Sequence, residues 1–378
     1  MGNVSLGGAR RLRQNEARVH RNDSMMNLAC GTMADVRYGL AARVEDVALN
    51  VAQGFVHQVF DWLPRIEPYT SIGTPNRVRA LCRTLLSPAE EYRTEPSPNM
   101  RGFRSYICLP SDGEQVEIRI RNQRKMVVTD RAGYVNEEFV LLDPLTPGWH
   151  TIHFTATRSG ATGHAKVYIV DPRVKVGIVS DIDDTAMVTV VPRLTLAVWN
   201  TLGERVSNRQ PVAGMANLFN SIIEANPGAP IVYLSNGAWN TAKSLQRFLK
   251  KWEFPKGALF LTDFGPTDTG IFRSGKGHKL RMLRWLMEEF PHIGWILVGD
   301  NGQSDPEIYT EIAHEFPGRV AAIGIRALTQ VERIIWLANT HPAQVGDHDE
   351  VDVPFIEAPN GNQLLAEFQN LGLLPGKR

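Results

Sequence analysis

Residues 174–185 read VKVGIVSDIDDT, and this stretch decides the expected fold. It begins as a short apolar run and ends in three aspartates within four residues. Valine and isoleucine pack well on a strand covered on both faces, so the run predicts a buried central strand. Asp181, Asp183 and Asp184 then stand at its carboxyl end, where open α/β sheets bind ligands. Because close carboxylates repel one another unless a cation lies among them, and hard oxygen ligands suit Mg²⁺, the stretch predicts a magnesium site.

The chain after residue 171 alternates between predicted strands and predicted helices. Short apolar runs predict strands at residues 174–179, 230–234, 258–261, 294–298 and 319–325. The segments between them carry apolar residues at three- and four-residue steps, which is typical of amphipathic helices. This alternation predicts the α/β fold class, with a Rossmann-like doubly wound parallel sheet. We place this domain at residues 173–378, with C-terminal helices near 330–338 and 362–371.

A different pattern precedes this domain. Residues 67–172 contain short β runs separated by proline, glycine and Asp-Gly turn signals. Several short strands at such spacing predict a small β-sandwich. Its strands are expected at residues 78–85, 116–121, 125–129, 138–142, 148–155 and 165–170. Nothing in the segment resembles a catalytic set, so its expected role is binding, or packing against the α/β domain.

The first residues of the chain fall into two further segments. Residues 1–33 are polar and rich in arginine, which predicts a disordered basic tail; a start of translation at Met25 or Met26 is the open alternative. Residues 34–66 carry apolar side chains at helical spacing and predict a helical segment. We expect this helix to pack against protein rather than lie on lipid, because its polar face is not rich in lysine or arginine.

Composition excludes several classes of protein. The 378 residues carry 41 basic and 40 acidic side chains, so no global field favours nucleic acid as a partner. The three cysteines, Cys30, Cys82 and Cys108, are scattered and form neither a metal motif nor a disulfide framework, which favours a reducing compartment. No apolar run approaches the roughly 18 residues of a membrane span, and no signal peptide is visible. These features predict a cytoplasmic protein without a transmembrane segment.

Four polar turns follow apolar strands or open helices in the α/β domain. The first is Asp-Ile-Asp-Asp-Thr at residues 181–185, and the second is Ser-Asn-Gly at residues 235–237. The third contains Lys276 and Lys279 in GKGHK, and the fourth is GDNGQSD at residues 299–305. A strand, a small polar turn and a helix in succession point backbone N–H groups and helix N-termini at an anion. The four turns together predict a phosphate site.

The residue types in these turns suit phosphoryl transfer. A carboxylate can attack phosphorus and form an aspartyl-phosphate, and a cation and a lysine must then stabilise the charge on the phosphoryl oxygens. We predict Asp181 and Asp300 as Mg²⁺ ligands, with Asp183 also in the metal set. Asp305 would support the ion directly or through water.

The remaining polar groups would handle the substrate. If Asp181 is the attacking carboxylate, Asp183 lies two residues after it. Asp183 can then protonate the leaving oxygen and activate the water that releases phosphate. Ser235 and Lys279 would hold the phosphoryl oxygens, and Lys276 is the alternative lysine. Further substrate contacts are predicted from the same turns, at Thr185, Asn236 and Gly237.

Taken together, these motifs resemble the haloacid dehalogenase-like phosphatase superfamily. The sequence resembles one branch of it, the actin-patch-associated phosphatidate phosphatases, most closely in SDIDDT, YLSNGAW, GHKLRMLRWLMEEFP and GDNGQSDPEIYTEIA. The preceding segment resembles that branch too, in YTSIGTPNRVRALCRTLL, VVTDRAGYVNEEF and PGWHTIHF, so the similarity covers about residues 66–374. It implies Mg²⁺-dependent hydrolysis of phosphatidate to diacylglycerol, with Asp181 as nucleophile and Asp183 as acid/base. It also favours Lys279, which aligns with the family's His-Lys pair.

Other functions stay open at this stage. The alternatives are a phosphatase of a soluble phosphomonoester, a phosphoprotein phosphatase, and a non-catalytic phosphatidate-binding module. Residues 186–210 carry apolar side chains with Arg193, Arg205 and Arg209, which suits a phospholipid headgroup or, equally, a helix packed on the domain edge. A phospholipid substrate would place the cytoplasmic protein peripherally on membranes. Protein partners are not predicted.

Overall fold

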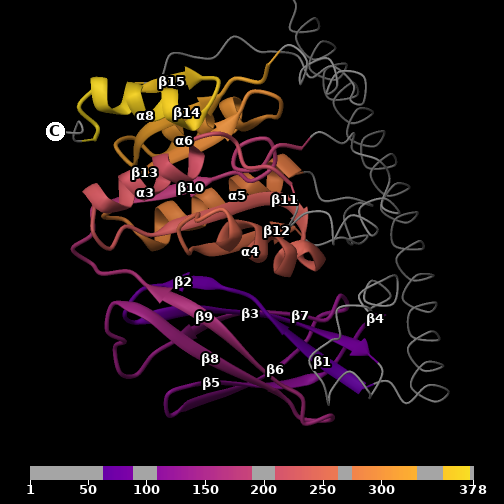
Figure 1. The fold of residues 1–378 in the computed structure, drawn as a ribbon. Helices are drawn as coiled ribbons and strands as arrows, with labels where there is room; N and C mark the ends of the chain where they lie inside the picture. Colours follow the sequence, from indigo (N-terminus) through magenta and orange to yellow (C-terminus); the bar gives the residue numbers. More distant parts are fainter. Residues whose placement is uncertain (1–62, 88–108, 190–208, 263–274, 330–351, 375–378) are drawn as a thin grey trace, which may run out of the picture. The chain divides into compact units, whose positions relative to one another are not determined.

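The computed structural model describes residues 63–87, 109–189, 209–262, 275–329 and 352–374 (Figure 1). These ranges belong to one compact unit of the chain, formed by Val56–Asp263 and Ser274–Arg378. The predicted basic tail and the predicted helix near residues 330–338 lie outside the described residues. So does the predicted helical segment, except for residues 63–66.

The prediction of helix for residues 63–66 is wrong. These residues begin strand β1 (Leu63–Pro68), which pairs with β3 (Arg77–Ser87) in antiparallel register from Leu63↔Ser87 onwards. Pro64 has no backbone N–H and cannot continue a helix, whereas it fits the start of a strand. Ile66 is buried in the core beneath the sheet, and this burial stabilises the strand.

Within the described residues, the first sheet has nine strands and is mostly antiparallel. Its hydrogen-bonded order is β1-β3-β2-β9-β8-β5-β6, and β4 and β7 also pair with β3. The β2–β9 pair is parallel. The further strands are β2 (Ser71–Gly73), β4 (Leu109–Pro110), β5 (Gln115–Ile120), β6 (Gln123–Val128), β7 (Tyr134–Val140), β8 (Gly148–Ala156) and β9 (Thr162–Ile169). All six β runs predicted here coincide with strands. The arrangement as a β-sandwich stays a prediction.

Alternation along the strands separates a buried face from a solvent face. In β5, Val116, Ile118 and Ile120 are buried while the residues between them are not. They join one hydrophobic cluster with residues such as Phe154 of β8 and Val167 of β9. A period of two places successive side chains on opposite faces, so the polar residues of these strands lie together on the outer face.

The second sheet is parallel throughout, with six strands in the order β12-β11-β10-β13-β14-β15. The strands are β10 (Val176–Ser180), β11 (Ile231–Ala238), β12 (Ala258–Thr262), β13 (Gly294–Asp300), β14 (Val320–Arg326) and β15 (Phe355–Ala358). The predicted α/β class with a parallel sheet is confirmed. Only β15 is absent from the predicted strands of this sheet.

Helices connect these strands and supply the rest of the core (Figure 1). They are α3 (Met215–Ala225), the 3₁₀ turn η4 (Trp239–Thr241), α4 (Ala242–Lys251), α5 (Gly275–Glu289), α6 (Asp305–Glu315) and α8 (Gly361–Asn370). Every residue of β12 and nearly every residue of β13 is buried, as expected for strands covered on both faces. Among the described residues, no helix is long and apolar enough to cross a membrane.

The two sheets share one hydrophobic cluster. Tyr69, Ile72 and Leu81 of the first sheet region belong to the same buried cluster as the core of the parallel sheet. Polar contacts add to this packing: Lys243 Nζ of α4 lies 2.6 Å from Glu67 Oε2, and Arg77 bridges to Glu289 of α5 at 2.7 Å. The continuous apolar packing indicates that the two sheets stabilise each other.

Candidate active site

The predicted polar turns meet at the carboxyl ends of three neighbouring strands. Asp181 directly follows β10, and its backbone N–H donates to the carbonyl of Val298 on β13 at 2.9 Å. Ser235 lies in β11, where the register with β12 shifts between Leu234 and Ala238. Asp300 ends β13. Parallel strands bring their carboxyl ends to one edge of a sheet, and this edge is therefore where the motifs converge.

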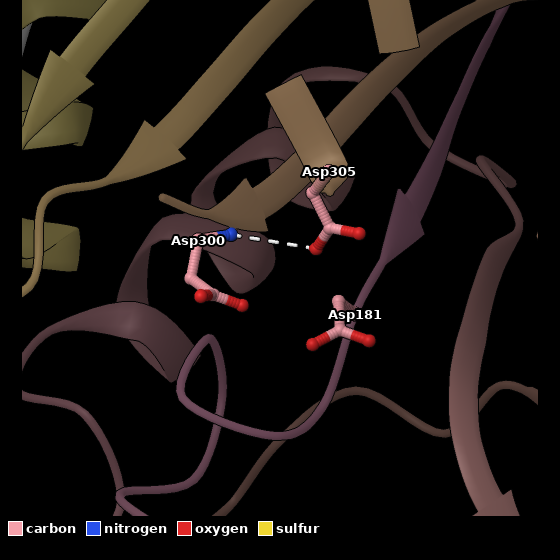
Figure 2. Close-up of side chains that lie close together, drawn as sticks. All are labelled: Asp181, Asp300 and Asp305. Carbon is pink, nitrogen blue, oxygen red and sulfur yellow. Dashed lines mark hydrogen bonds between the residues drawn. The ribbon is translucent and has the colours of Figure 1, made fainter. Parts of the chain in front are cut away.

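Three aspartates form a buried acidic cluster. One carboxylate oxygen from each of Asp181, Asp300 and Asp305 lies within 4.8 Å of the other two, and all three residues are at most 1% exposed. Figure 2 shows the side chains of Asp181, Asp300 and Asp305 lying close together. Burial raises the pKa of Asp181 to about 8, although Lys279 opposes the shift, and burial together with Asp305 and Asp181 raises the pKa of Asp300 well above its ordinary value.

A buried lysine compensates part of this negative charge. Lys279 of α5 is 1% exposed, and its Nζ lies 2.7 Å from Asp181 Oδ1 and 2.5 Å from Asp305 Oδ1. Burial acts to lower the pKa of Lys279, but the two carboxylates outweigh it and raise the pKa, so the lysine stays charged. Lys276 is exposed and lies 3.6 Å from Glu311. The structure thus brings Lys279 to the cluster and leaves Lys276 at the surface.

The donor set of the cluster fits a hard divalent cation. Asp181 Oδ2 and Asp300 Oδ2 are buried and have no hydrogen-bond partner within the described ranges. Both oxygens of Asp305 are engaged, because Oδ1 accepts from Lys279 and Oδ2 accepts from the backbone N–H of Asp300 at 3.4 Å. Unpaired buried carboxylate oxygens are costly unless an ion satisfies them. The geometry therefore favours Asp181 and Asp300 as direct ligands, with Asp305 in a supporting position.

The Asp183 carboxylate lies beside this cluster and is not one of its three members. Ser235 Oγ donates to Asp183 Oδ2 at 3.0 Å, and Thr189 Oγ1 donates to Asp183 Oδ1 at 3.4 Å. Arg209 Nη1 lies 4.0 Å from Asp183 Oδ1. These contacts hold the Asp183 carboxylate outside the three-aspartate cluster, which suits proton transfer better than metal coordination through the side chain.

The predicted substrate-binding residues are brought to the same edge of the sheet. Ser235 Oγ also accepts from the backbone N–H of Gly237 at 2.9 Å, so its single proton is directed to Asp183 while the oxygen is held by the turn. Asn236 Oδ1 and Thr185 Oγ1 are buried and lack a hydrogen-bond partner among the described residues. A Cβ on Gly275 would come within 2.6 Å of the Asn236 side chain, so a larger residue at the start of α5 would require Asn236 to shift.

Sequence reasoning missed Arg326, whose side chain contacts the backbone of the acidic turn. Asp184 adopts a left-handed conformation with φ 58°, and its carbonyl accepts from Arg326 Nη1 at 2.7 Å. Its Oδ1 accepts from the backbone N–H of Thr189 at 2.7 Å. Arg326 is buried and pairs in register with Asp300. The available signal was a charged residue directly after the predicted strand 319–325, at the same sheet edge as the four turns.

Arg209 is the described part of the arginine-bearing segment noted in the sequence. Its side chain is 11% exposed, and Nη1 is buried without a hydrogen-bond partner in the described part of the chain. The backbone around it is anchored, because Val188 N–H donates to Gln210 O at 3.0 Å and Trp252 Nε1 donates to Arg209 O at 3.1 Å. Arg193 and Arg205 lie outside the described residues.

Comparison with known proteins points to one family. Residues 176–327, which include all of the site residues described above, match the family model "Phosphatidate phosphatase APP1, catalytic domain". The chain is 28% identical over 152 residues to phosphatidate phosphatase APP1 of Saccharomyces cerevisiae, covering 40% of this chain and 26% of that protein. It is 29% identical over 152 residues to an uncharacterized protein of Schizosaccharomyces pombe, covering 40% and 25%. The match thus spans about a quarter of the length of these curated relatives.

Similarity to solved structures is weaker. A chain from the structure of a Pnkp1/Rnl/Hen1 complex shares 15% sequence identity with this chain. The match covers 39% of this chain and 44% of the other, with a TM-score of 0.29.

Proposed function

We propose, from the match of residues 176–327 to the family model of the phosphatidate phosphatase APP1 catalytic domain, that this chain is a Mg²⁺-dependent phosphatidate phosphatase. It would hydrolyse phosphatidate to diacylglycerol and phosphate. The observation that carries the proposal is the buried cluster of Asp181, Asp300 and Asp305 with the charged Lys279. Buried like charges at the carboxyl edge of a parallel sheet destabilise a fold, so their presence indicates a functional site.

The fold supports a haloacid dehalogenase-like assignment. The acidic turn follows β10, which lies between β11 and β13 within the parallel sheet. The Ser-Asn-Gly turn, the lysine and the second acidic turn come from β11, α5 and the β13–α6 connection. This succession of strand-end motifs is the one that the resemblance to that superfamily implies.

The metal in this proposal is Mg²⁺, held by Asp181 and Asp300 with support from Asp305. When bound, Mg²⁺ neutralises charge on the phosphoryl oxygens and on the surrounding carboxylates. Its direct ligands would be the two carboxylate oxygens that lack partners, Asp181 Oδ2 and Asp300 Oδ2. Lys279 supplies a second, permanent positive charge at the same place.

In the first step, a carboxylate oxygen of Asp181 forms a bond to phosphorus while the bond from phosphorus to the glycerol oxygen breaks. Asp183 gives its proton to that leaving oxygen, so diacylglycerol departs neutral and the phosphoryl group stays on Asp181 as an aspartyl-phosphate. In the second step, Asp183 takes a proton from water, whose oxygen attacks phosphorus and releases phosphate. Both carboxyl groups return to their starting states. The hydrogen bond from Ser235 restrains the Asp183 carboxylate during both proton transfers.

Arg209 supports an anionic substrate at this position. Its Nη1 lies 4.0 Å from Asp183 Oδ1 and has no hydrogen-bond partner within the described ranges. Guanidinium groups bind phosphate oxygens through charge-assisted hydrogen bonds. We therefore assign Arg209 to the substrate phosphate.

A phosphate-release assay tests the proposed function. Purified protein is given phosphatidate in mixed micelles, and sugar phosphates and a phosphopeptide in parallel, with and without Mg²⁺. The proposal expects release from phosphatidate that requires Mg²⁺ and is lost in Asp181→Asn. Turnover of soluble esters without turnover of phosphatidate would replace it with a soluble-substrate phosphatase. Phosphatidate binding without turnover at any Mg²⁺ concentration would leave a binding module.

A further inference from the structure

Four basic side chains form a straight row across the outer face of the first sheet. The strand registers pair Arg124 of β6 with Arg119 of β5, Arg119 with His153 of β8, and His153 with His164 of β9. Directly paired residues project from the same face of an antiparallel sheet. The ring centroids of His153 and His164 lie 5.6 Å apart, as expected for such neighbours. We refer to these four residues as the cationic row.

The row faces solvent rather than the core. Arg119, Arg124 and His164 are exposed, and His153 is partly exposed. The residues that alternate with them in these strands, such as Ile118, Phe154 and Ala165, are buried in the hydrophobic cluster of this sheet. The burial pattern therefore settles which way the four side chains point.

Few acidic groups balance this row. Within the described ranges Arg119 forms no ion pair, and Arg124 pairs with Glu117 at 3.4 Å. Lys166 lies two residues after His164 in β9, on the same face, and adds another positive charge. Its Nζ donates to Thr151 Oγ1 at 2.8 Å. Like charges placed directly opposite in a sheet are destabilising. The row therefore does not stabilise the fold, which indicates that it binds an anionic partner.

We propose that the cationic row docks this protein on the surface of a bilayer that contains anionic phospholipids. Two exposed apolar side chains on the same face favour lipid over another polyanion. Met126 is 52% exposed and lies opposite Glu117, and Val128 is 61% exposed and lies opposite Gln115. Basic residues beside exposed apolar ones suit the interface of an anionic membrane. The choice of lipid rests in part on the proposed function, whose substrate lies in membranes.

Acidic pH would strengthen this docking. His153 faces Arg119 from β5, and His164 and Lys166 from β9. Partial burial and these basic neighbours lower the pKa of His153 below its usual 6.5. The histidine is therefore neutral at pH 7, and its positive charge is added as the pH falls below 6.5.

Vesicle sedimentation tests the proposal separately from catalysis. The full chain carrying Asp181→Asn is mixed with vesicles of phosphatidylcholine alone or of phosphatidylcholine with phosphatidylserine, which is not a substrate of the proposed reaction. We expect binding only to the anionic vesicles. Arg119→Gln combined with Arg124→Gln should weaken it about 30-fold, given about 1 kcal/mol for each basic residue at such a surface.

A matched double variant controls for net charge. Arg247 and Lys250 are exposed on α4, and changing both to glutamine removes the same charge elsewhere. Equal binding by the row variant and the unchanged chain overturns the proposal, and so does an equal loss in the α4 variant. A row variant that loses binding to a DNA oligonucleotide but keeps vesicle binding would assign the row to nucleic acid instead. Unchanged thermal unfolding of the row variant shows that its fold is intact.

Discussion

The two sheets place their charged side chains in opposite settings. In the parallel sheet, Asp181, Asp300, Asp305 and Lys279 are all buried at the carboxyl edge. In the antiparallel sheet, Glu117 and Arg119 of β5 and Arg124 of β6 share an outer face, while the residues that alternate with them in β5 are apolar and buried. A buried charge interacts strongly with its neighbours, because little water screens it, whereas an exposed charge is screened. The same substitution of a charged residue should therefore change stability and activity much more in the buried cluster than on the exposed sheet face.

The largest expected effect is on catalysis by Asp181. Asp181→Asn removes the proposed nucleophile while preserving its volume, so phosphate release should fall by at least about 1000-fold. The measurement is the initial rate of release from phosphatidate. Asp171→Asn, at a partly exposed carboxylate paired with Arg173 outside the site, is the control and should keep full activity. Retained activity in Asp181→Asn would remove this residue from the reaction.

Lys279→Met should have the next largest effect. It leaves Asp181 and Asp305 without their positive partner, and breaking a buried pair destabilises a fold by roughly 3–5 kcal/mol. Phosphate release should also fall by about 100-fold or more through lost charge stabilisation. Urea unfolding without Mg²⁺ and the release assay with Mg²⁺ measure the two effects.

Lys276→Met provides the matched comparison on the same helix. Its side chain is exposed beside Glu311, so both stability and activity should stay close to those of the unchanged chain. If the two lysine variants behaved alike, the distinction between the buried and the surface lysine would fail.

Arg209→Gln should affect substrate binding more than the chemical step. Loss of one charge-assisted contact to phosphate predicts a KM about tenfold higher with a smaller change in kcat. Steady-state kinetics on phosphatidate separate the two parameters, and Arg209→Lys should recover part of the loss. A variant with a tenfold lower kcat and an unchanged KM would instead place Arg209 in the chemical step.

The buried cluster should make the metal-free protein pH-sensitive. Because the pKa of Asp181 is raised from 3.8 to about 8, the folded state holds a proton that the unfolded state releases at lower pH. The free energy of unfolding should therefore fall as the pH rises from about 4 to about 8. Urea unfolding in EDTA measures this slope. Asp181→Asn should flatten it, and a slope unchanged by that substitution would contradict the assignment.

The smallest effect is expected on the exposed sheet face. Arg124 and Glu117 form a surface pair at 3.4 Å, and such pairs contribute about 0–1 kcal/mol. A double-mutant cycle with Arg124→Ala and Glu117→Ala, followed by urea unfolding, should give a coupling energy within that range. A coupling as large as that of the buried lysine would erase the contrast between the two sheets.

Much of the parallel sheet and its site could be predicted from local pattern. Apolar runs followed by small polar turns located Asp181, Ser235 and Asp300 at strand ends, and parallel topology then required those ends to meet. Lys279 was favoured through resemblance and not through spacing. Arg326 escaped notice because nothing in its immediate sequence distinguishes it; its role arises from its register with Asp300 and its contact with Asp184.

Composition, periodicity and turn residues by themselves determined the α/β class, the positions of most strands along the chain, and the polar turns that carry the proposed chemistry, because these features are local in the chain. Only the tertiary structure decided that Lys279 rather than Lys276 reaches the acidic cluster, and that Asp183 turns toward Ser235 and Arg209 instead. The tertiary structure alone also placed the four residues of the cationic row side by side. Burial and strand register depend on residues far apart in sequence, so a local sequence pattern does not reveal burial or register.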